Sequence, residues 1–111
     1  MIVIFAKLTA KPGKRDKLAR GLDAIREDTE SESGTLVFTV HTARDHDDVV
    51  LCYEVYRDDA AMAEHREGKA LLAFMDEIGD LIEGAPELYY VTPVGAKIDP
   101  SVAMPRSIAD A

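Results

Sequence analysis

Four stretches of the chain alternate in the way that predicts β-strands. Ile2–Thr9, Thr35–Thr42 and the segment 49–56 are rich in β-branched and aromatic residues, and Glu87–Val94 is a fourth run with Pro93 near its end or on an edge. In the first and third runs the residues that point to either face are largely apolar. We therefore expect little water on either face of the sheet.

Helical spacing appears between these strands. Leu18, Leu22 and Ile25 form an apolar stripe within a helix expected from Lys14 to about Glu30. A second helix is expected to begin near Asp59, where Asp58 and Asp59 offer an N-cap and favourable charge.

This second helix is expected to break at Gly68, where a new segment starts at an angle. The later part carries the strongest amphipathic stripe of the chain, formed by Leu71, Phe74, Met75, Ile78, Leu81 and Ile82. We expect this stripe to face the core.

The order β-α-β-β-α-β, with a split second helix, predicts a ferredoxin-like α+β fold with an antiparallel sheet and helices on one face. The chain's own helices leave the other apolar face bare, so we expect a homodimer packed sheet to sheet. Residues 1–95 form the predicted domain. Residues 96–111 form a tail that is extended or docked on the partner subunit, because its composition shows no periodicity.

Composition narrows the possible partners and location. A net charge of -8 over 111 residues argues against nucleic acid and anionic membranes as partners. The start of the chain lacks the features of a signal peptide, and no stretch approaches the roughly 18 apolar residues of a membrane span. A single cysteine, Cys52, excludes an intrachain disulfide and is expected in the core. We expect a soluble, cytoplasmic protein.

Two acidic regions are interpreted as surface rather than as metal sites. Glu27, Asp28, Glu30 and Glu32 form the acidic end of the first helix and are expected to be solvated. The loop 43–48 holds one histidine and three aspartates, but ligands this close on one loop rarely supply a defined geometry. No metal site is predicted.

Several short motifs, in this order and spacing, resemble the antibiotic biosynthesis monooxygenase domain family over roughly residues 1–95. They are AKPGK at residues 10–14, LVFTVHTARD at 36–45, CYEVYRDDAAMAEH at 52–65, LLAF at 71–74 and PELYYVTPV at 86–94. The resemblance implies a dimeric α+β barrel with a cleft between sheet and helices that binds a flat aromatic molecule. Some members oxidise a phenol, quinol or anthrone with molecular oxygen and no flavin, metal or haem.

Carried over by position, His65 matches the family's helix histidine, and Tyr56 stands where the family often has tryptophan. Ala70 replaces a second histidine that is common in the family. Haem-degrading relatives use a helix histidine on iron and a strand tryptophan on the porphyrin. Since this chain lacks the tryptophan and the second histidine, no haem or other cofactor is expected.

Four residues are candidate catalytic groups. His65 is a candidate base because imidazole titrates near neutral pH, with pairing to a neighbouring glutamate as the structural alternative. Tyr56 is a candidate hydrogen-bond donor or stacking partner. His41 points either into the cleft or into the dimer interface. Glu54 is a second possible base if burial raises its pKa, while pairing with Arg57 is the simpler outcome.

Candidate apolar walls of the substrate pocket are Phe5, Met62, Leu72 and Met75. The leading hypothesis is a cofactor-independent monooxygenase acting on a small aromatic molecule. A non-catalytic dimer that binds a small hydrophobic ligand or responds to stress is the alternative from another class. An isomerase or cyclase on the same fold is a third, because such ring chemistry needs the same pocket and base without oxygen.

Overall fold

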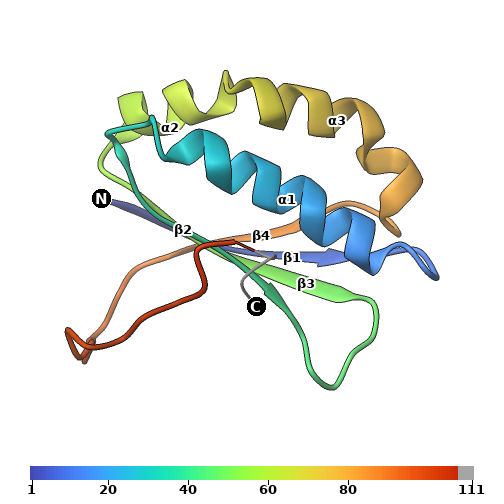
Figure 1. The fold of residues 1–111 in the computed structure, drawn as a ribbon. Helices are drawn as coiled ribbons and strands as arrows, with labels where there is room; N and C mark the ends of the chain where they lie inside the picture. Colours follow the sequence, from blue (N-terminus) through green and yellow to red (C-terminus); the bar gives the residue numbers. More distant parts are fainter. Residues whose placement is uncertain (108–111) are drawn as a thin grey trace.

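Three helices lie on one side of a four-stranded antiparallel sheet in the computed structural model, which describes residues 1–107 (Figure 1). In chain order the elements are β1 (Ile2–Thr9), α1 (Arg15–Thr29), β2 (Thr35–Thr42), β3 (Val49–Tyr56), α2 (Asp59–Arg66), α3 (Lys69–Leu81) and β4 (Glu87–Val91). The predicted ferredoxin-like α+β fold with a split second helix is confirmed.

The boundaries of the elements follow from local chemistry. Gly13 takes a left-handed backbone, φ 76°, in the turn before α1. The backbone N–H of Ala61 donates to the Asp58 carboxylate over 2.9 Å, which caps α2 as predicted. β4 ends at Val91, ahead of Pro93, and is therefore shorter than the predicted run to Val94.

The strand order is β2-β3-β1-β4, and its register sets side chains in rows across the sheet. One row on the side facing the helices contains Phe38, Glu54, Ile4 and Tyr90, in strand order. The next row of this face holds Cys52, which is buried in the core with residues of α1 and α3, as predicted. The same strands thus supply both the core and, in the row beside it, the carboxyl group of Glu54 between two apolar residues.

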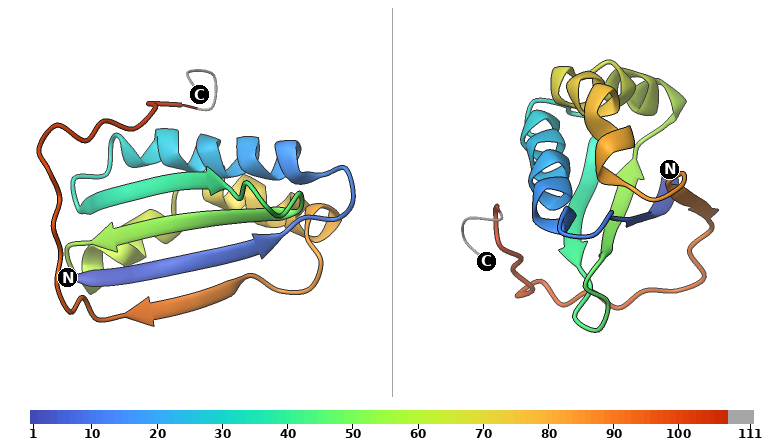
Figure 2. Two further views of the ribbon diagram at one scale, coloured as in Figure 1. Left: turned by 90° about the horizontal axis from the view of Figure 1, so that it is seen from below. Right: turned by 90° about the vertical axis from the view of Figure 1, so that its right-hand side faces the viewer.

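The helices cover the sheet unevenly. α1 packs on β2 and β3, and α2 packs on the same two strands. By contrast, β4 pairs only with β1, lies at the margin of the sheet (Figure 2), and all five of its residues are exposed. This edge of the sheet is therefore bare on both faces.

We call the side of the sheet away from the helices the open face. Phe5, Leu51 and Tyr89 lie there, with 48%, 40% and 54% of their surface exposed. The ring centroids of Phe5 and Tyr53 are 5.0 Å apart on this face. The centre of the open face is thus apolar, as the alternation predicts, but in the single chain it is exposed to water.

The chain leaves β4 and passes the end of the sheet toward α1 and β2 (Figure 2), without a helix or strand between residues 92 and 107. Met104, Pro105 and Ser107 end up beside α1 and β2 of the same chain. The rest of the predicted tail, residues 108–111, lies outside the described residues. No helix within residues 1–107 combines the length and the apolar character that a membrane span needs.

Candidate functional site

A buried histidine–carboxylate pair lies between α2 and the start of β2. His65 is 6% exposed, and its Nδ1 is 2.9 Å from Oε1 of Glu32. The same oxygen of Glu32 accepts the hydroxyl of Thr35 over 2.8 Å. The expected alternatives for His65, a surface position or a pairing with a neighbouring glutamate on α2, are therefore wrong, because the partner is 33 residues earlier in the chain.

Glu32 is also the residue that the sequence analysis missed. It was predicted to be solvated surface together with Glu27, Asp28 and Glu30, yet it is 9% exposed. It follows the end of α1, where the chain turns back into β2, so its side chain enters the layer between α2 and the sheet. No hydrophobic periodicity extends into this turn. The one sequence signal for Glu32 is its position two residues before Gly34.

A close backbone approach brings His65 to this pair. A Cβ placed on Gly34 would lie only 2.4 Å from the Cβ of Ala61, so α2 rests directly on the turn before β2. His65 is one helical turn after Ala61 and lies on the same face of α2. Glycine at position 34 thus determines how closely α2, which carries His65, approaches the turn before β2.

Aromatic rings complete the surroundings of His65. The ring centroids of His65 and Tyr56 are 5.1 Å apart, and those of His65 and Phe38 are 5.4 Å apart. Tyr56 is only 1% exposed. Tyr56 and His65, nine residues apart in sequence, thus lie next to each other in the structure.

Glu54 joins the cluster through Tyr56, whose hydroxyl donates a hydrogen bond to Oε1 of Glu54. Burial raises the pKa of Glu54, while the hydroxyl and the nearby His65 oppose that change. Burial and the Glu54 carboxylate also raise the pKa of Tyr56, which keeps the phenol protonated. The expected pairing of Glu54 with Arg57 is wrong, since Arg57 donates to the backbone carbonyl of Ser33 instead.

The other candidate residues are dispersed. Met62 of α2 is half-buried against the small cluster of Ile4, Tyr56 and Ala61. Leu72 and Met75 are 56% and 55% exposed on α3.

Phe5 and His41 belong to the open face, on the other side of the sheet from His65. His41 Nε2 lies 2.8 Å from the hydroxyl oxygen of Thr39. The structure therefore brings His65, Tyr56, Glu54 and Met62 together and leaves Phe5 and His41 apart from them.

Further residues flank Glu54 across the sheet. Ile4 is directly opposite Glu54, and Tyr90 is opposite Ile4 on β4. The Tyr90 hydroxyl oxygen accepts from Arg66 of α2 over 3.3 Å. Alternation in the fourth strand identifies Tyr90 and Leu88 as one face, but only the register shows that this is the face of Glu54.

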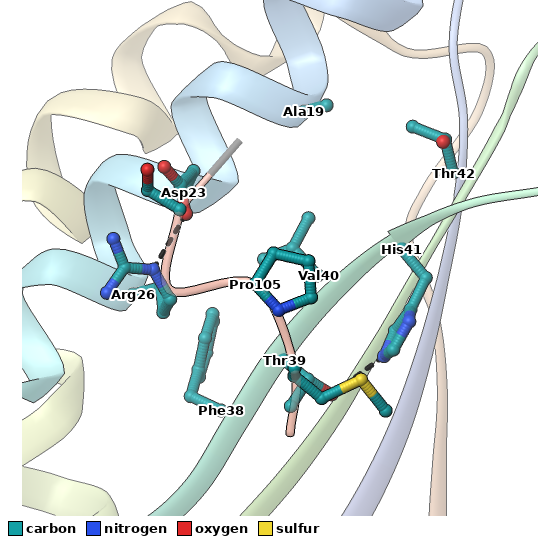
Figure 3. Close-up of a pocket in the computed structure, with 11 residues that line it drawn as sticks. Ala19, Asp23, Arg26, Phe38, Thr39, Val40, His41, Thr42 and Pro105 are labelled. Carbon is teal, nitrogen blue, oxygen red and sulfur yellow. Dashed lines mark hydrogen bonds and ion pairs between the residues drawn. The ribbon is translucent and has the colours of Figure 1, made fainter. Parts of the chain in front are cut away.

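Among residues 1–107, two hollows border the surroundings of His65, one through Phe38 and the other through Glu32. A pocket of about 230 Å³ is enclosed by α1, β2 and the tail (Figure 3). A shallower hollow at the end of α1 is lined by Asp28, Ser31, Glu32, Glu64, Glu67, Gly68 and Lys69. Within residues 1–107, no three histidine, cysteine, aspartate or glutamate side chains come together in a way that fits a metal ion.

Comparison with known proteins agrees with the geometry of the fold. The family model described as antibiotic biosynthesis monooxygenase matches residues 1–77. "Putative monooxygenase Rv0793" of Mycobacterium tuberculosis is 28% identical over 81 residues, which cover 73% of this chain and 79% of that protein.

Solved structures are similar over most of their length. PA3566 from Pseudomonas aeruginosa superposes with a TM-score of 0.78 at 26% identity, over 85% of this chain and 94% of its own. The structure of Rv0793 gives a TM-score of 0.76 at 23% identity, over 86% of this chain and 96% of its own, which supports the fold.

Proposed function

Because this chain belongs to the antibiotic biosynthesis monooxygenase family, we propose that it oxidises a small electron-rich aromatic molecule with molecular oxygen. The substrate class is a quinol, phenol or anthrone, and no cofactor takes part. The observation that carries the proposal is Glu54, a half-buried carboxyl whose pKa is raised by burial and which is held by the hydroxyl of Tyr56.

A base is the main catalytic group that such a reaction needs from the protein. Removing a proton from the substrate gives an electron-rich anion, which reduces oxygen directly. For an anthrone, the CH₂ group and O₂ give a carbonyl group and water. A carboxylate whose pKa is raised toward neutrality accepts a proton more readily than an ordinary one. Glu54 is therefore the proposed base.

Tyr56 and His65 are proposed to support Glu54 rather than to replace it. Tyr56 orients the carboxylate through its hydroxyl. His65 is buried with Nδ1 held by Glu32, and it acts on Glu54 through its charge when protonated. His41 has no part in this proposal, because it lies on the open face.

The substrate is proposed to lie on the apolar surface over β1 and β4 next to Glu54. Ile4 and Met62 supply its inner part. Leu88 and Tyr90 are 53% and 57% exposed on the same side of the sheet, where the strand has no cover. Exposed apolar side chains beside a buried titratable group are typical of a binding site.

Oxygen uptake by the purified chain with added anthrone, a quinol and a phenol tests this function. We expect turnover above background without added metal, and a loss of about 100-fold or more in kcat for Glu54→Gln, since general base catalysis contributes at least that much. Glu77→Gln, an exposed carboxylate on α3, is the matched control and should retain full activity.

Background rates with the whole panel would contradict the proposal, and full activity of Glu54→Gln would exclude Glu54 as the base. Substrate conversion that proceeds equally well without oxygen would identify an isomerase or cyclase instead.

We also propose that the protein works as a homodimer that buries the open face. Phe5, Leu51 and Tyr89 present apolar surface there that the chain's own helices do not cover. A second copy packed on this face is the simplest cover, because a two-fold interface uses the same patch twice.

A further inference from the structure

The pocket beside β2 wraps around the outer edge of that strand. Phe38, Val40 and Thr42 on the helix-facing side line it, and so do Thr39 and His41 on the open face (Figure 3). Residues that alternate between both faces line one cavity only where it follows the strand's edge. β2 is an edge strand, so its outer backbone groups are not paired with another strand of residues 1–107.

The charge in the pocket wall is compensated. Asp23 of α1 is 8% exposed, and its Oδ1 lies 2.7 Å from Nε of Arg26. Glu30 and Glu27 approach the same guanidinium at 3.2 and 3.8 Å. With three carboxylates around it, Arg26 offers little net attraction to an anion, and the paired Asp23 offers little to a cation. The pocket therefore favours a neutral ligand.

The size and walls of the pocket indicate a small flat ligand. Its volume of about 230 Å³ is below the roughly 300–1,000 Å³ of sites for drug-sized molecules. Phe38 and Pro105 contribute ring surfaces, and Met104 contributes a flexible thioether that adapts to aromatic partners. A molecule of one or two fused rings fits these dimensions.

Polar groups are available for one edge of such a ligand. The Thr39 hydroxyl and the His41 imidazole are 2.8 Å apart on the pocket wall, and Thr42 adds another hydroxyl. The outer edge of β2 adds backbone donors and acceptors. A hydroxyl or carbonyl group on the ligand would find both kinds of partner.

We propose that this pocket binds a small, neutral, planar aromatic molecule that carries a hydroxyl or carbonyl group, with residues 104–107 as a strap across it. The site is separate from the proposed catalytic cluster, since Glu54 and Tyr56 do not line it. Its inner wall nevertheless reaches that cluster, because Phe38 packs on His65 at 5.4 Å between ring centroids. The proposal does not depend on the oxygenase activity.

Titration of the full chain with 2-naphthol, a neutral two-ring phenol at pH 7, tests the proposal by nuclear magnetic resonance. We expect the amide signals of residues 38–42 and 104–107 to shift in a saturable way. Met104→Asp puts a charge on the wall and should weaken binding by about 10-fold or more. Val102→Asp is the matched control, since Val102 and Met104 are 58% and 59% exposed and Val102 does not line the pocket.

A second variant, Thr42→Trp, fills the pocket from an exposed position and should also abolish binding. Glu54→Gln should bind 2-naphthol at this pocket as the unmodified chain does, which separates this site from the catalytic one. Unchanged affinity in both Met104→Asp and Thr42→Trp would overturn the proposal. So would shifts confined to residues near Glu54, no saturable binding up to millimolar concentration, or tighter binding of an anionic naphthalene sulfonate.

Discussion

Two glutamates, the buried Glu32 and the half-buried Glu54, show how surroundings assign different roles to one residue type. Glu32 accepts one hydrogen bond from the Thr35 hydroxyl and pairs with His65 through the same oxygen, so its carboxyl group is held between the start of β2 and α2. Glu54 receives one hydroxyl, from Tyr56, and its desolvation is only partly offset. The first carboxylate holds the histidine in place, whereas the second is suited to take up a proton.

The raised pKa of Glu54 predicts a pH-dependent cost to folding. The folded state binds this proton more tightly than the unfolded state, whose pKa is near 4.5. The resulting stabilisation is full below pH 4.5 and is lost as the pH rises through the folded-state pKa. Glu54→Gln should therefore gain stability relative to the unmodified chain as the pH rises from 4 to 7, measured by urea unfolding.

Glu77→Gln provides the reference for this measurement. Glu77 is exposed on α3, and its replacement should give a nearly constant difference over the same range of pH. A difference for Glu54→Gln that stays flat or shrinks with rising pH would contradict the assignment.

For single residues, the sequence predicts those that belong to the periodic pattern of a helix or strand. Strand alternation and the start of the second helix predict which elements hold Glu54, Tyr56 and His65, and the family resemblance singles out Tyr56 and His65. All three meet in the structure. The burial of Glu32 is not predicted, because Glu32 lies in a turn, where the direction of the side chain depends on how α2 packs. The His65–Glu32 bond is a tertiary contact that has no local signature.

The helix α2 makes one very close contact with the turn before β2. Its position over β2 is fixed by the approach of Ala61 to Gly34, and the hydrogen bond from Arg57 to Ser33 holds the same turn from the other side. Small residues at this crossing allow the helix to sit low enough for its histidine to reach Glu32.

Gly34→Ala should destabilise the protein by about 1–3 kcal/mol, because the added methyl group overlaps Ala61 and overpacks a tight contact. Adding Ala61→Gly should recover part of this loss, although glycine in a helix itself costs about 1 kcal/mol. Urea unfolding of the single and double variants measures the coupling.

Gly79→Ala is the control for this pair. It is exposed on α3, nothing lies within 4 Å of the added Cβ, and it should leave stability unchanged or raise it by up to about 1 kcal/mol. If Gly34→Ala behaves like Gly79→Ala, the crossing is not tight.

Element type and order follow from the sequence because each helix and strand carries its own period. The break at Gly68 is predicted by the same logic, and the structure places α2 and α3 on either side of it. The end of β4 and the course of residues 92–107 are not predictable in this way. Both depend on tertiary contacts, because these residues show no hydrophobic periodicity.

In the whole molecule, the two faces of the sheet are covered unequally. One face of the sheet has three helices, while the other presents Phe5, Leu51 and Tyr89 to solvent. The sequence predicts this difference between the faces, because strands that are apolar on both sides need both faces of the sheet buried, and the helices of the chain cover one face. It does not reveal that β4 lacks cover on both sides.

Phe5→Lys should dissociate the proposed dimer, because a charge at the centre of an apolar interface is left unpaired. We expect the dissociation constant to rise about 30-fold or more, as for an interface hot spot. Analytical ultracentrifugation at micromolar concentration measures it.

Leu72→Lys serves as the comparison. Leu72 is 56% exposed on α3, against 48% for Phe5, and its replacement should leave the assembly intact. An unmodified chain that sediments as a 12.2 kDa monomer would contradict the dimer itself.

The bare strand β4 connects the two proposed surfaces. Tyr89 and Val91 face the side of the proposed dimer, while Leu88 and Tyr90 face the proposed substrate. Within residues 1–107, β1 is the one strand that pairs with β4. A partner copy that fixes β4 would therefore hold the substrate surface in place as well. By thermodynamic reciprocity, substrate would strengthen self-association by the same factor. Apparent substrate affinity should then rise with the concentration of the protein itself.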